Sequence, residues 1–193
     1  LLQHPAIDGV YVVLSPEDQW WGFTEYAQHP DVVRVDGGVE RCHSVLNALR
    51  AMEARVGNED WVLVHDAARP CVRREDIHHL VSMVEASADG GLLGMPVRDT
   101  MKRTSSTDEV RETVDRNNLW HAYTPQMFRF NRLLVAMTQA IGSSCLVTDE
   151  ASAIEAAGGQ PLMVEGHADN IKITRPEDLP LAEYFISQQA ENP

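Results

Sequence analysis

Hydrophobic positions along this chain follow two alternating patterns. Short apolar runs such as Val10–Leu14 are typical of buried strands, whereas apolar residues that recur three or four positions apart are typical of amphipathic helices. The first pattern predicts strands over 10–14, 32–35, 61–65, 92–97, 163–165 and 170–174. The second pattern predicts helices over 40–54, 74–88, 131–140, 149–157 and 177–189. Because strands and helices alternate, we predict an α/β fold with a mostly parallel, Rossmann-like sheet flanked by helices.

Residues 97–118, which we call the arm, interrupt this alternation. A polar segment at 105–108 separates two short runs in which charged and apolar residues are interleaved, the second of them Val110–Val114. This pattern is typical of a β-hairpin. A two-stranded hairpin has too little apolar surface to be stable alone. We therefore expect the arm to pack on a second subunit and to form part of a homodimer interface.

The composition narrows the classes of partner. The 193 residues suit a single domain spanning residues 1–193. Lys and Arg total 16 against 29 Asp and Glu, and the net charge of −13 argues against a nucleic-acid partner, since phosphate backbones bind basic surfaces. A small phosphorylated substrate held by a few cations remains compatible with this charge. No run approaches about 18 apolar residues, so we expect no membrane span.

Cysteine usage and missing motifs exclude further classes. Cys42, Cys71 and Cys145 are odd in number and form no CxxC pair, so we expect free thiols in the reducing cytoplasm. The sequence contains no GxGxxG, HExxH or serine-nucleophile elbow. These absences argue against the dinucleotide-binding, zinc-hydrolase and serine-hydrolase classes that the motifs define.

The end of the predicted strand at 61–65 carries the first candidate chemistry. Asp66 and Arg69 follow the strand, separated by two alanines, and Pro70 ends the segment. Ligands of open α/β sheets bind beyond the carboxyl ends of the strands. An acid and an arginine at such an end can position a metal–phosphate group. The alternative is a capping aspartate beside a solvated arginine, and the segment alone does not separate the two.

Three further positions have two interpretations each. Ser44 follows a Gly-Gly turn that ends at Gly38 and opens a helix, so it either packs in the helix or faces a bound anion. Lys172 lies in a short apolar segment and either faces solvent or points into a site. Arg116, at the return of the arm, is either a salt-bridge residue or a bidentate phosphate ligand. Thr148 precedes two acids and most simply caps a helix.

Seven motifs taken together resemble one enzyme family. They are Asp36-Gly-Gly…Arg41…Ser44-Val, His65-Asp-Ala-Ala-Arg-Pro70, Pro96-Val-Arg-Asp-Thr-Met-Lys-Arg103, Thr113-Val-Asp-Arg116, Thr124-Pro-Gln126, Thr148-Asp-Glu-Ala151 and Gly166…Asp169-Asn-Ile-Lys-Ile-Thr174. In this order and spacing they resemble the 2-C-methyl-D-erythritol 4-phosphate cytidylyltransferases of the bacterial non-mevalonate isoprenoid pathway. The resemblance implies a nucleotidyltransferase fold, CTP as co-substrate, Mg²⁺ as divalent metal, and a cytoplasmic homodimer joined through the arm.

The resemblance also implies the reaction and the role of each candidate residue. The family transfers CMP from CTP to 2-C-methyl-D-erythritol 4-phosphate and releases pyrophosphate. Position by position it implies cytidine contacts from Gly38 and Ser44, ribose or metal-side contacts from Asp66 and Ala67, sugar-phosphate contacts from Arg69, Thr100, Arg116 and Thr148, and a catalytic cation at Lys172. Thr100 and Arg116 would come from the partner's arm, with Arg116 also counted as catalytic. Asp66 is the one side chain suggested as a metal ligand.

Family members begin with a strand and a glycine-rich loop that bears an Arg and a Lys for the triphosphate. We expect the printed chain to start after this segment and so to lack part of the triphosphate site. Two other functions stay open from the sequence. One is a sister cytidylyltransferase acting on ribitol 5-phosphate, and the other is a non-catalytic nucleotide-binding module.

Overall fold

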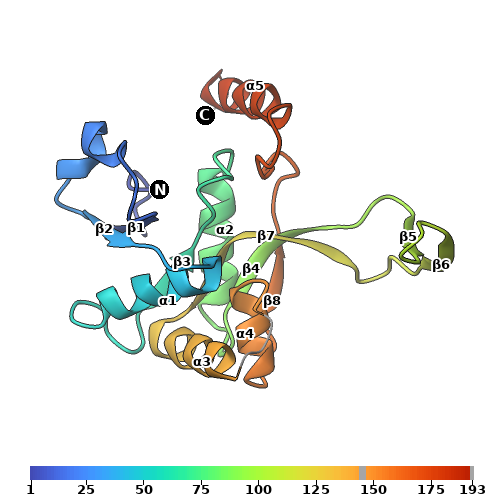
Figure 1. The fold of residues 1–193 in the computed structure, drawn as a ribbon, viewed down its shortest axis with the longest axis horizontal. Helices are drawn as coiled ribbons and strands as arrows, with labels where there is room; N and C mark the ends of the chain where they lie inside the picture. Colours follow the sequence, from blue (N-terminus) through green and yellow to red (C-terminus); the bar gives the residue numbers. More distant parts are fainter. Residues whose placement is uncertain (144–146, 192–193) are drawn as a thin grey trace.

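A computed structural model describes residues 1–143 and 147–191 (Figure 1). The strands are β1 Val10–Leu14, β2 Val32–Asp36, β3 Trp61–Val64, β4 Gly91–Pro96, β5 Met101–Thr104, β6 Val110–Val114, β7 Trp120–Arg129 and β8 Leu162–Glu165. The α-helices are α1 Arg41–Met52, α2 Arg74–Val84, α3 Phe130–Gly142, α4 Glu150–Ala156 and α5 Asp178–Glu191, and two short 3₁₀ helices, η1 Trp21–Phe23 and η2 Glu25–Gln28, join β1 to β2. Cys42 and Cys71 are free thiols, while Cys145 lies outside the described residues.

The main sheet has the strand order β3-β7-β4-β8. β4 and β8 are parallel, and β7 runs antiparallel to both β3 and β4, so three of the four strands point the same way. The predicted mostly parallel α/β fold is therefore confirmed. β1 and β2 form a separate parallel pair. No helix in the described part of the chain is long and apolar enough to cross a membrane.

β7, at the centre of the sheet, is absent from the predicted strands. Its sequence is WHAYTPQMFR, in which polar residues and Pro125 interrupt the apolar pattern that would indicate a strand. The strand is nevertheless buried over residues 124–128, because β3 and β4 flank it and helices cover it. Its polar side chains bond to neighbouring loops, as described below, and so position the candidate site.

The core consists of two clusters, one on each face of the sheet. Successive strand residues point to opposite faces, and Leu92 and Phe128 pack with α1, α3 and α4 while Leu93 and Met127 pack with α2. Helices therefore cover both faces, as the alternating pattern predicts. Gly90, which precedes β4 with a φ of 74°, adopts a left-handed conformation next to Phe128 that a residue with a Cβ would not fit.

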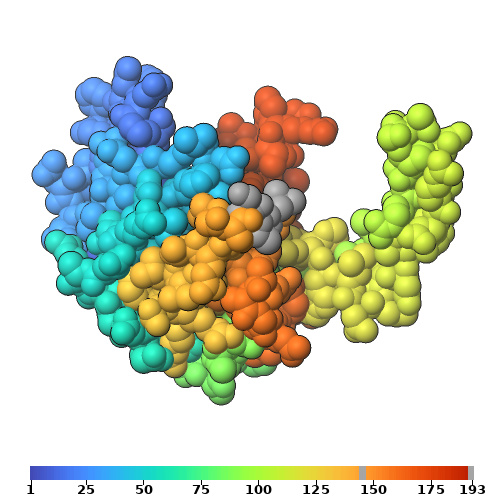
Figure 2. All heavy atoms as spheres, turned by 60° about the horizontal axis from the view of Figure 1, so that its bottom comes forward, coloured from blue at the N-terminus to red at the C-terminus, as the bar shows by residue number. Residues whose placement is uncertain are grey.

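The arm is the hairpin that the sequence predicts. β5 and β6 pair antiparallel, and nearly every residue of both strands is exposed. A hydrogen bond from the Val97 amide to the Leu119 carbonyl oxygen closes its base at 2.9 Å. Figures 1 and 2 show the arm extending away from the body of the molecule. The role of the arm in a dimer stays a prediction.

The predicted strand at 170–174 is wrong, because this segment is a loop. Its Ile173 amide donates to the Ala68 carbonyl oxygen at 2.8 Å, and its Asn170 side chain donates to the Thr124 carbonyl oxygen at 2.9 Å. These are single bonds to two different segments rather than a strand ladder. The alternation of apolar residues around Lys172 therefore reflects a loop docked on the body.

Candidate active site

The carboxylate of Asp66 lies between two cations just beyond the end of β3. Its Oδ1 accepts a hydrogen bond from Arg41 Nε at 2.8 Å, and its Oδ2 accepts one from Lys172 Nζ at 2.8 Å. The Asp66 side chain is 14% exposed and that of Lys172 is 42% exposed. The Lys172 side chain could face solvent or a site on the sequence alone, and in the structure its ammonium group is directed at Asp66. A buried carboxylate thus holds a solvent-facing ammonium group in place.

Arg41 links this carboxylate to a second, fully buried one. Its Nη1 and Nη2 donate to Glu150 Oε1 and Oε2 at 2.6 and 3.1 Å, and the Glu150 side chain is 0% exposed. The bidentate geometry fixes the guanidinium plane. The sequence-based assignment gave neither residue a role. Arg41 stood within a recognised motif, but Glu150 looked like an ordinary first-turn acid, since nothing local indicated its buried partner 109 positions away.

The paired charges of this group determine the pKa values of its side chains. Burial opposes ionisation of Asp66, but the hydrogen bonds from Lys172 and Arg41 outweigh it and lower the pKa of Asp66. Burial likewise opposes the charge of Arg41, yet Glu150 and Asp66 raise its pKa. Burial raises the pKa of Glu150 although Arg41 opposes that shift. The Asp66 carboxylate and the Arg41 guanidinium are therefore both ionised at neutral pH.

A hydrogen-bonded chain through β7 fixes the position of Asp66. The Asp66 amide donates to Thr124 Oγ1 at 3.0 Å, so the Thr124 hydroxyl is left to donate to His65 Nδ1 at 3.0 Å. His65 Nε2 then carries the ring proton and donates to the Arg69 carbonyl oxygen at 2.9 Å. Burial lowers the pKa of His65, in keeping with a neutral ring. His65 thus shapes the 65–69 turn rather than facing a ligand.

The start of α4 is tied to β7 by a buried glutamine. Gln126 Oε1 accepts from the Ala151 amide at 2.8 Å, and its Nε2 donates to Asp149 Oδ2 at 2.9 Å. Asp149 is the N-cap of α4 in a reciprocal capping box with Ser152. Thr148, one position earlier, is exposed, and its amide donates to Ser152 Oγ at 3.2 Å. The helix cap that the sequence pattern placed at Thr148 is therefore Asp149, and Thr148 is an exposed residue that precedes it.

The Arg69 guanidinium is held by contacts within the protein. Its Nη1 donates to the Asn170 carbonyl oxygen at 2.8 Å, and its guanidinium lies 4.8 Å from the centroid of the Tyr123 ring. Its Nε is buried and has no hydrogen-bond partner among the described residues. Burial lowers the pKa of Arg69. Arg69 therefore anchors the Lys172 loop, and its contact with a sugar phosphate stays a prediction.

The Gly-Gly turn before α1 is held by Ser44. The Gly38 amide donates to Ser44 Oγ at 3.0 Å, and a side chain at position 38 would meet the Cβ of His43 at 2.4 Å. Only glycine fits this approach. Gly38 and Ala67 are both exposed. The serine hydroxyl thus holds the turn, and its contact with a bound anion stays a prediction.

Two predicted site residues stand apart from this group. Thr100 and Arg116 lie on the arm, where both are exposed, and Arg116 Nη1 donates to the Arg98 carbonyl oxygen. Within the described residues, neither contacts Asp66 or Lys172. The fold therefore brings Gly38, Ser44, Asp66, Ala67, Arg69, Thr148 and Lys172 to the body of the molecule and leaves Thr100 and Arg116 on the arm (Figure 1).

Comparisons with known proteins cover almost the whole chain. The family model "IspD: 2-C-methyl-D-erythritol 4-phosphate cytidylyltransferase" matches residues 1–188. The 2-C-methyl-D-erythritol 4-phosphate cytidylyltransferase of Hahella chejuensis is 55% identical over 96% of this chain and 77% of that protein. The corresponding protein of Vibrio vulnificus strain CMCP6 is 50% identical over 99% of this chain and 81% of its own length.

Solved structures agree with this match. The crystal structure of the Francisella tularensis 2-C-methyl-D-erythritol 4-phosphate cytidylyltransferase is 36% identical, with a TM-score of 0.85 over 95% of this chain and 83% of that chain. Sequence and fold thus support the same assignment. The chain belongs to the 2-C-methyl-D-erythritol 4-phosphate cytidylyltransferase family.

Proposed function

We propose that this chain transfers CMP from CTP to 2-C-methyl-D-erythritol 4-phosphate. The products are 4-diphosphocytidyl-2-C-methyl-D-erythritol and pyrophosphate. Besides the family membership, the observation that carries the proposal is the Lys172–Asp66 pair, in which a largely buried carboxylate orients an exposed ammonium group just beyond the end of β3. Phosphoryl-type transfers depend mostly on positioning and charge neutralisation, which such a pair supplies.

In the proposed reaction, a phosphate oxygen of the sugar phosphate attacks the α-phosphorus of CTP. One P–O bond forms to the attacking oxygen while the P–O bond to the β-phosphate breaks, and pyrophosphate leaves with the electron pair. Both reactants are anions that repel each other. An ammonium group has three N–H donors, so Lys172 can keep its bond to Asp66 and still donate to both reacting phosphates.

The remaining body residues suit the binding of CTP and the sugar phosphate. We assign the cytidine to the exposed turn of Gly38 and Ser44, where backbone amides at a helix start favour an anionic or polar ligand. Ala67 would border the ribose. Arg69 and Thr148 would face the sugar phosphate, to which Arg69 offers a positive charge and the exposed Thr148 a hydroxyl group.

A divalent metal such as Mg²⁺ fits this arrangement through a single carboxylate. Mg²⁺ in nucleotide sites takes most of its ligands from phosphates and water and one or two from protein carboxylates. Asp66 Oδ1 lies against the Arg41 guanidinium, whereas Oδ2 accepts one hydrogen bond from Lys172 and retains a further lone pair. Asp66 is therefore the residue that would hold the metal, which would neutralise charge on the triphosphate. With CTP as substrate, the reaction belongs in the cytoplasm.

We further propose that the arm completes the site of a second copy. Thr100 and Arg116 are exposed on a hairpin that projects from the body, as Figure 2 shows. An arginine there can bind a phosphate bidentately. In a symmetric homodimer, each arm would then carry these two side chains to the partner's bound sugar phosphate.

The assay that tests the proposed function is pyrophosphate release with CTP and Mg²⁺. Two proteins are compared. One is the 193-residue chain, and the other is the same chain joined to the part of the Hahella chejuensis relative to which this chain has no match. Each protein receives either 2-C-methyl-D-erythritol 4-phosphate or ribitol 5-phosphate. We expect release with the first acceptor only. Release with ribitol 5-phosphate would instead favour the sister activity, and silence with both acceptors in the extended protein would favour a non-catalytic nucleotide-binding module.

A further inference from the structure

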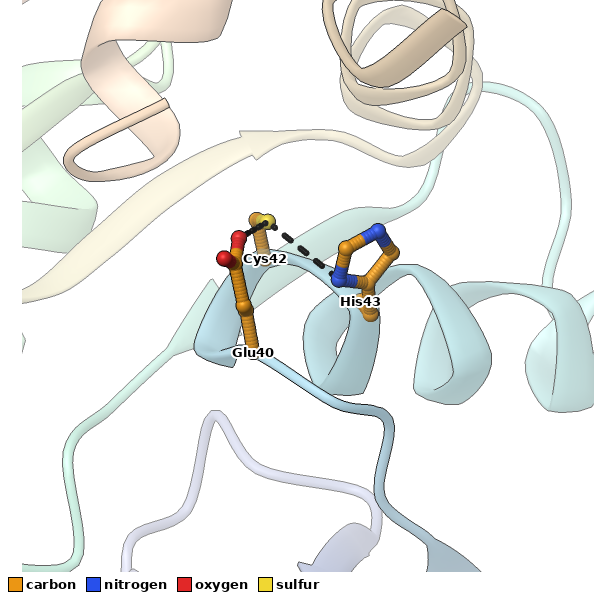
Figure 3. A group of neighbouring side chains, drawn as sticks. All are labelled: Glu40, Cys42 and His43. Atoms are coloured by element: carbon orange, nitrogen blue, oxygen red, sulfur yellow. Dashed lines mark hydrogen bonds between the residues drawn. The ribbon is translucent and has the colours of Figure 1, made fainter. Parts of the chain in front are cut away.

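Three side chains with metal-binding atoms converge at the start of α1, outside the group around Asp66. They are Glu40, Cys42 and His43, and Figure 3 shows them gathered over the first turn of the helix. Within residues 1–143 and 147–191, this is the one group of three such residues whose ligand atoms all lie within 4.8 Å of one another. We propose that this group is a binding site for Zn²⁺ or a cation of similar chemistry.

The distances agree with a tetrahedral zinc site. Cys42 Sγ lies 3.7 Å from Glu40 Oε2 and 3.8 Å from His43 Nδ1. Typical Zn–S, Zn–N and Zn–O bond lengths at tetrahedral angles place the sulfur about 3.6 Å from each of the other two ligand atoms. Both observed separations are close to this value. A small rotation of the exposed Glu40 side chain would close the remaining edge.

Local structure holds two of the ligands and leaves the third free to move. Cys42 packs against the larger core cluster, and the half-buried His43 follows it in the first turn of α1, beside the Gly38 turn. Glu40 is the N-cap residue of α1, yet its side chain makes no capping hydrogen bond. An acid at this position usually accepts from the first free amides of the helix. Here the carboxylate turns toward Cys42 instead.

The donor set selects the class of cation. Thiolate and imidazole ligands favour zinc over Mg²⁺ or Ca²⁺, which bind oxygen. On binding, a Zn–S bond forms as the Cys42 thiol loses its proton to water, while His43 Nδ1 and a Glu40 oxygen donate lone pairs. The Cys42 thiolate and the Glu40 carboxylate together balance the charge of Zn²⁺, so the loaded site has no net positive charge to oppose the positive end of the helix dipole. Three protein ligands leave the fourth position open to water or an added ligand.

The test measures binding of Zn²⁺ to the reduced protein, with Co²⁺ as an optical probe. We expect one equivalent of Zn²⁺ and, with Co²⁺, a thiolate-to-metal charge-transfer absorption. Cys42→Ser should remove that absorption, and Cys42→Ser, His43→Asn and Glu40→Gln should each weaken Zn²⁺ binding at least about tenfold. Two matched controls, Cys145→Ser and the exposed helical His78→Asn, should bind as the unmodified protein does.

The controls make every outcome decisive. Circular dichroism without metal verifies that each variant folds, and the exposed Glu40→Gln change should leave the fold intact. Zn²⁺ affinity that is unchanged in Cys42→Ser and His43→Asn would overturn the proposal. A Co²⁺–thiolate absorption that survives Cys42→Ser but disappears in Cys145→Ser would assign the metal to a different thiol and overturn it equally.

Discussion

The group around Asp66 and the arm differ in how the chain positions functional side chains. Around Asp66, four separate segments meet through charged hydrogen bonds, and the paired residues are as far as 109 positions apart in the sequence. On the arm, the charged pairs join neighbouring strands only 9 to 11 positions apart, as in Arg103 with Glu112 and Lys102 with Thr113. The first arrangement requires the whole fold, whereas the second requires only the hairpin.

This difference indicates two ways of completing an active site. Residues on the body reach their positions when the monomer folds, because buried bonds such as Arg41–Glu150 leave little freedom. Thr100 and Arg116 stay exposed, and in the proposed homodimer a second molecule would bring them to a ligand. The following predictions test whether the proposed division between body and arm is correct.

The largest expected effect is a loss of turnover when a residue on the body, Lys172, is replaced. Lys172→Ala should lower kcat by about 10²- to 10³-fold, since removing one preorganised donor to a transition state has effects of this size. Asp66 then loses one of its two cationic partners but keeps Arg41. Steady-state pyrophosphate release by the extended protein of the proposed assay measures kcat.

The chain offers a matched control on the arm. Lys102 is its only other lysine, and its ammonium bonds to Thr113 within the hairpin. Lys102→Ala should leave kcat within about threefold of the unmodified value, as is usual for an exposed surface pair. Equal losses in the two variants would contradict a special role for Lys172.

The second largest effect is a loss of stability when the buried Arg41–Glu150 pair is broken. Glu150→Ala should lower the free energy of unfolding by about 3 kcal/mol, because it leaves Arg41 without the partner that offsets its burial. This is the lower end of the usual range, since Arg41 is 36% exposed and retains Asp66. Glu155→Ala, at an exposed position of the same helix, should change the value by less than about 0.5 kcal/mol. Urea unfolding measures both, and a loss below about 1 kcal/mol for Glu150→Ala would show that the pair is not stabilising.

A subunit-mixing experiment separates the two ways of completing the site. Lys172→Ala and Arg116→Ala proteins should each have little activity alone. In a mixed dimer, the site with an intact body receives the intact arm of the other subunit. Random exchange should therefore restore about a quarter of the unmodified activity, since half of the dimers are mixed and each has one working site of two.

A mixture with no restored activity would contradict the proposed exchange of arms between subunits. If Arg116 acts in its own subunit, both sites of a mixed dimer carry a defect, and mixing restores nothing. Arg116→Ala should also raise the KM for 2-C-methyl-D-erythritol 4-phosphate more than that for CTP, because it is proposed to bind the sugar phosphate. Equal changes in both KM values would identify Arg116 as a structural residue of the arm.

Sequence patterns predicted the outline of the fold because its strands and helices are locally consistent. The strands before and after α1 and the hairpin of the arm have the periodicity that their burial requires. β7 was missed because its buried polar residues, such as Thr124 and Gln126, serve tertiary hydrogen bonds rather than a strand pattern. The segment around Lys172 was assigned as a strand because a docked loop can also alternate apolar and polar residues.

The candidate site shows the same limit. Asp66 and Lys172 were recognised through a family resemblance, and the structure brings them within 2.8 Å of each other. No local feature identifies Glu150 as the partner of Arg41, since the pairing depends on packing of α1 against α3 and α4. Buried ion pairs between distant segments are therefore the part of a site that local sequence patterns do not reveal.

The smallest expected effect lies on the arm. Arg103 and Glu112 are paired across β5 and β6 at 2.7 Å, but their side chains are 66% and 58% exposed. Exposed pairs of this kind contribute little, so Arg103→Ala should change the free energy of unfolding by no more than about 0.5 kcal/mol. Urea unfolding at two protein concentrations measures it. A larger loss that grows with protein concentration would show that Arg103 contacts the partner's surface, and the arm would then hold the dimer together as well as carry Thr100 and Arg116.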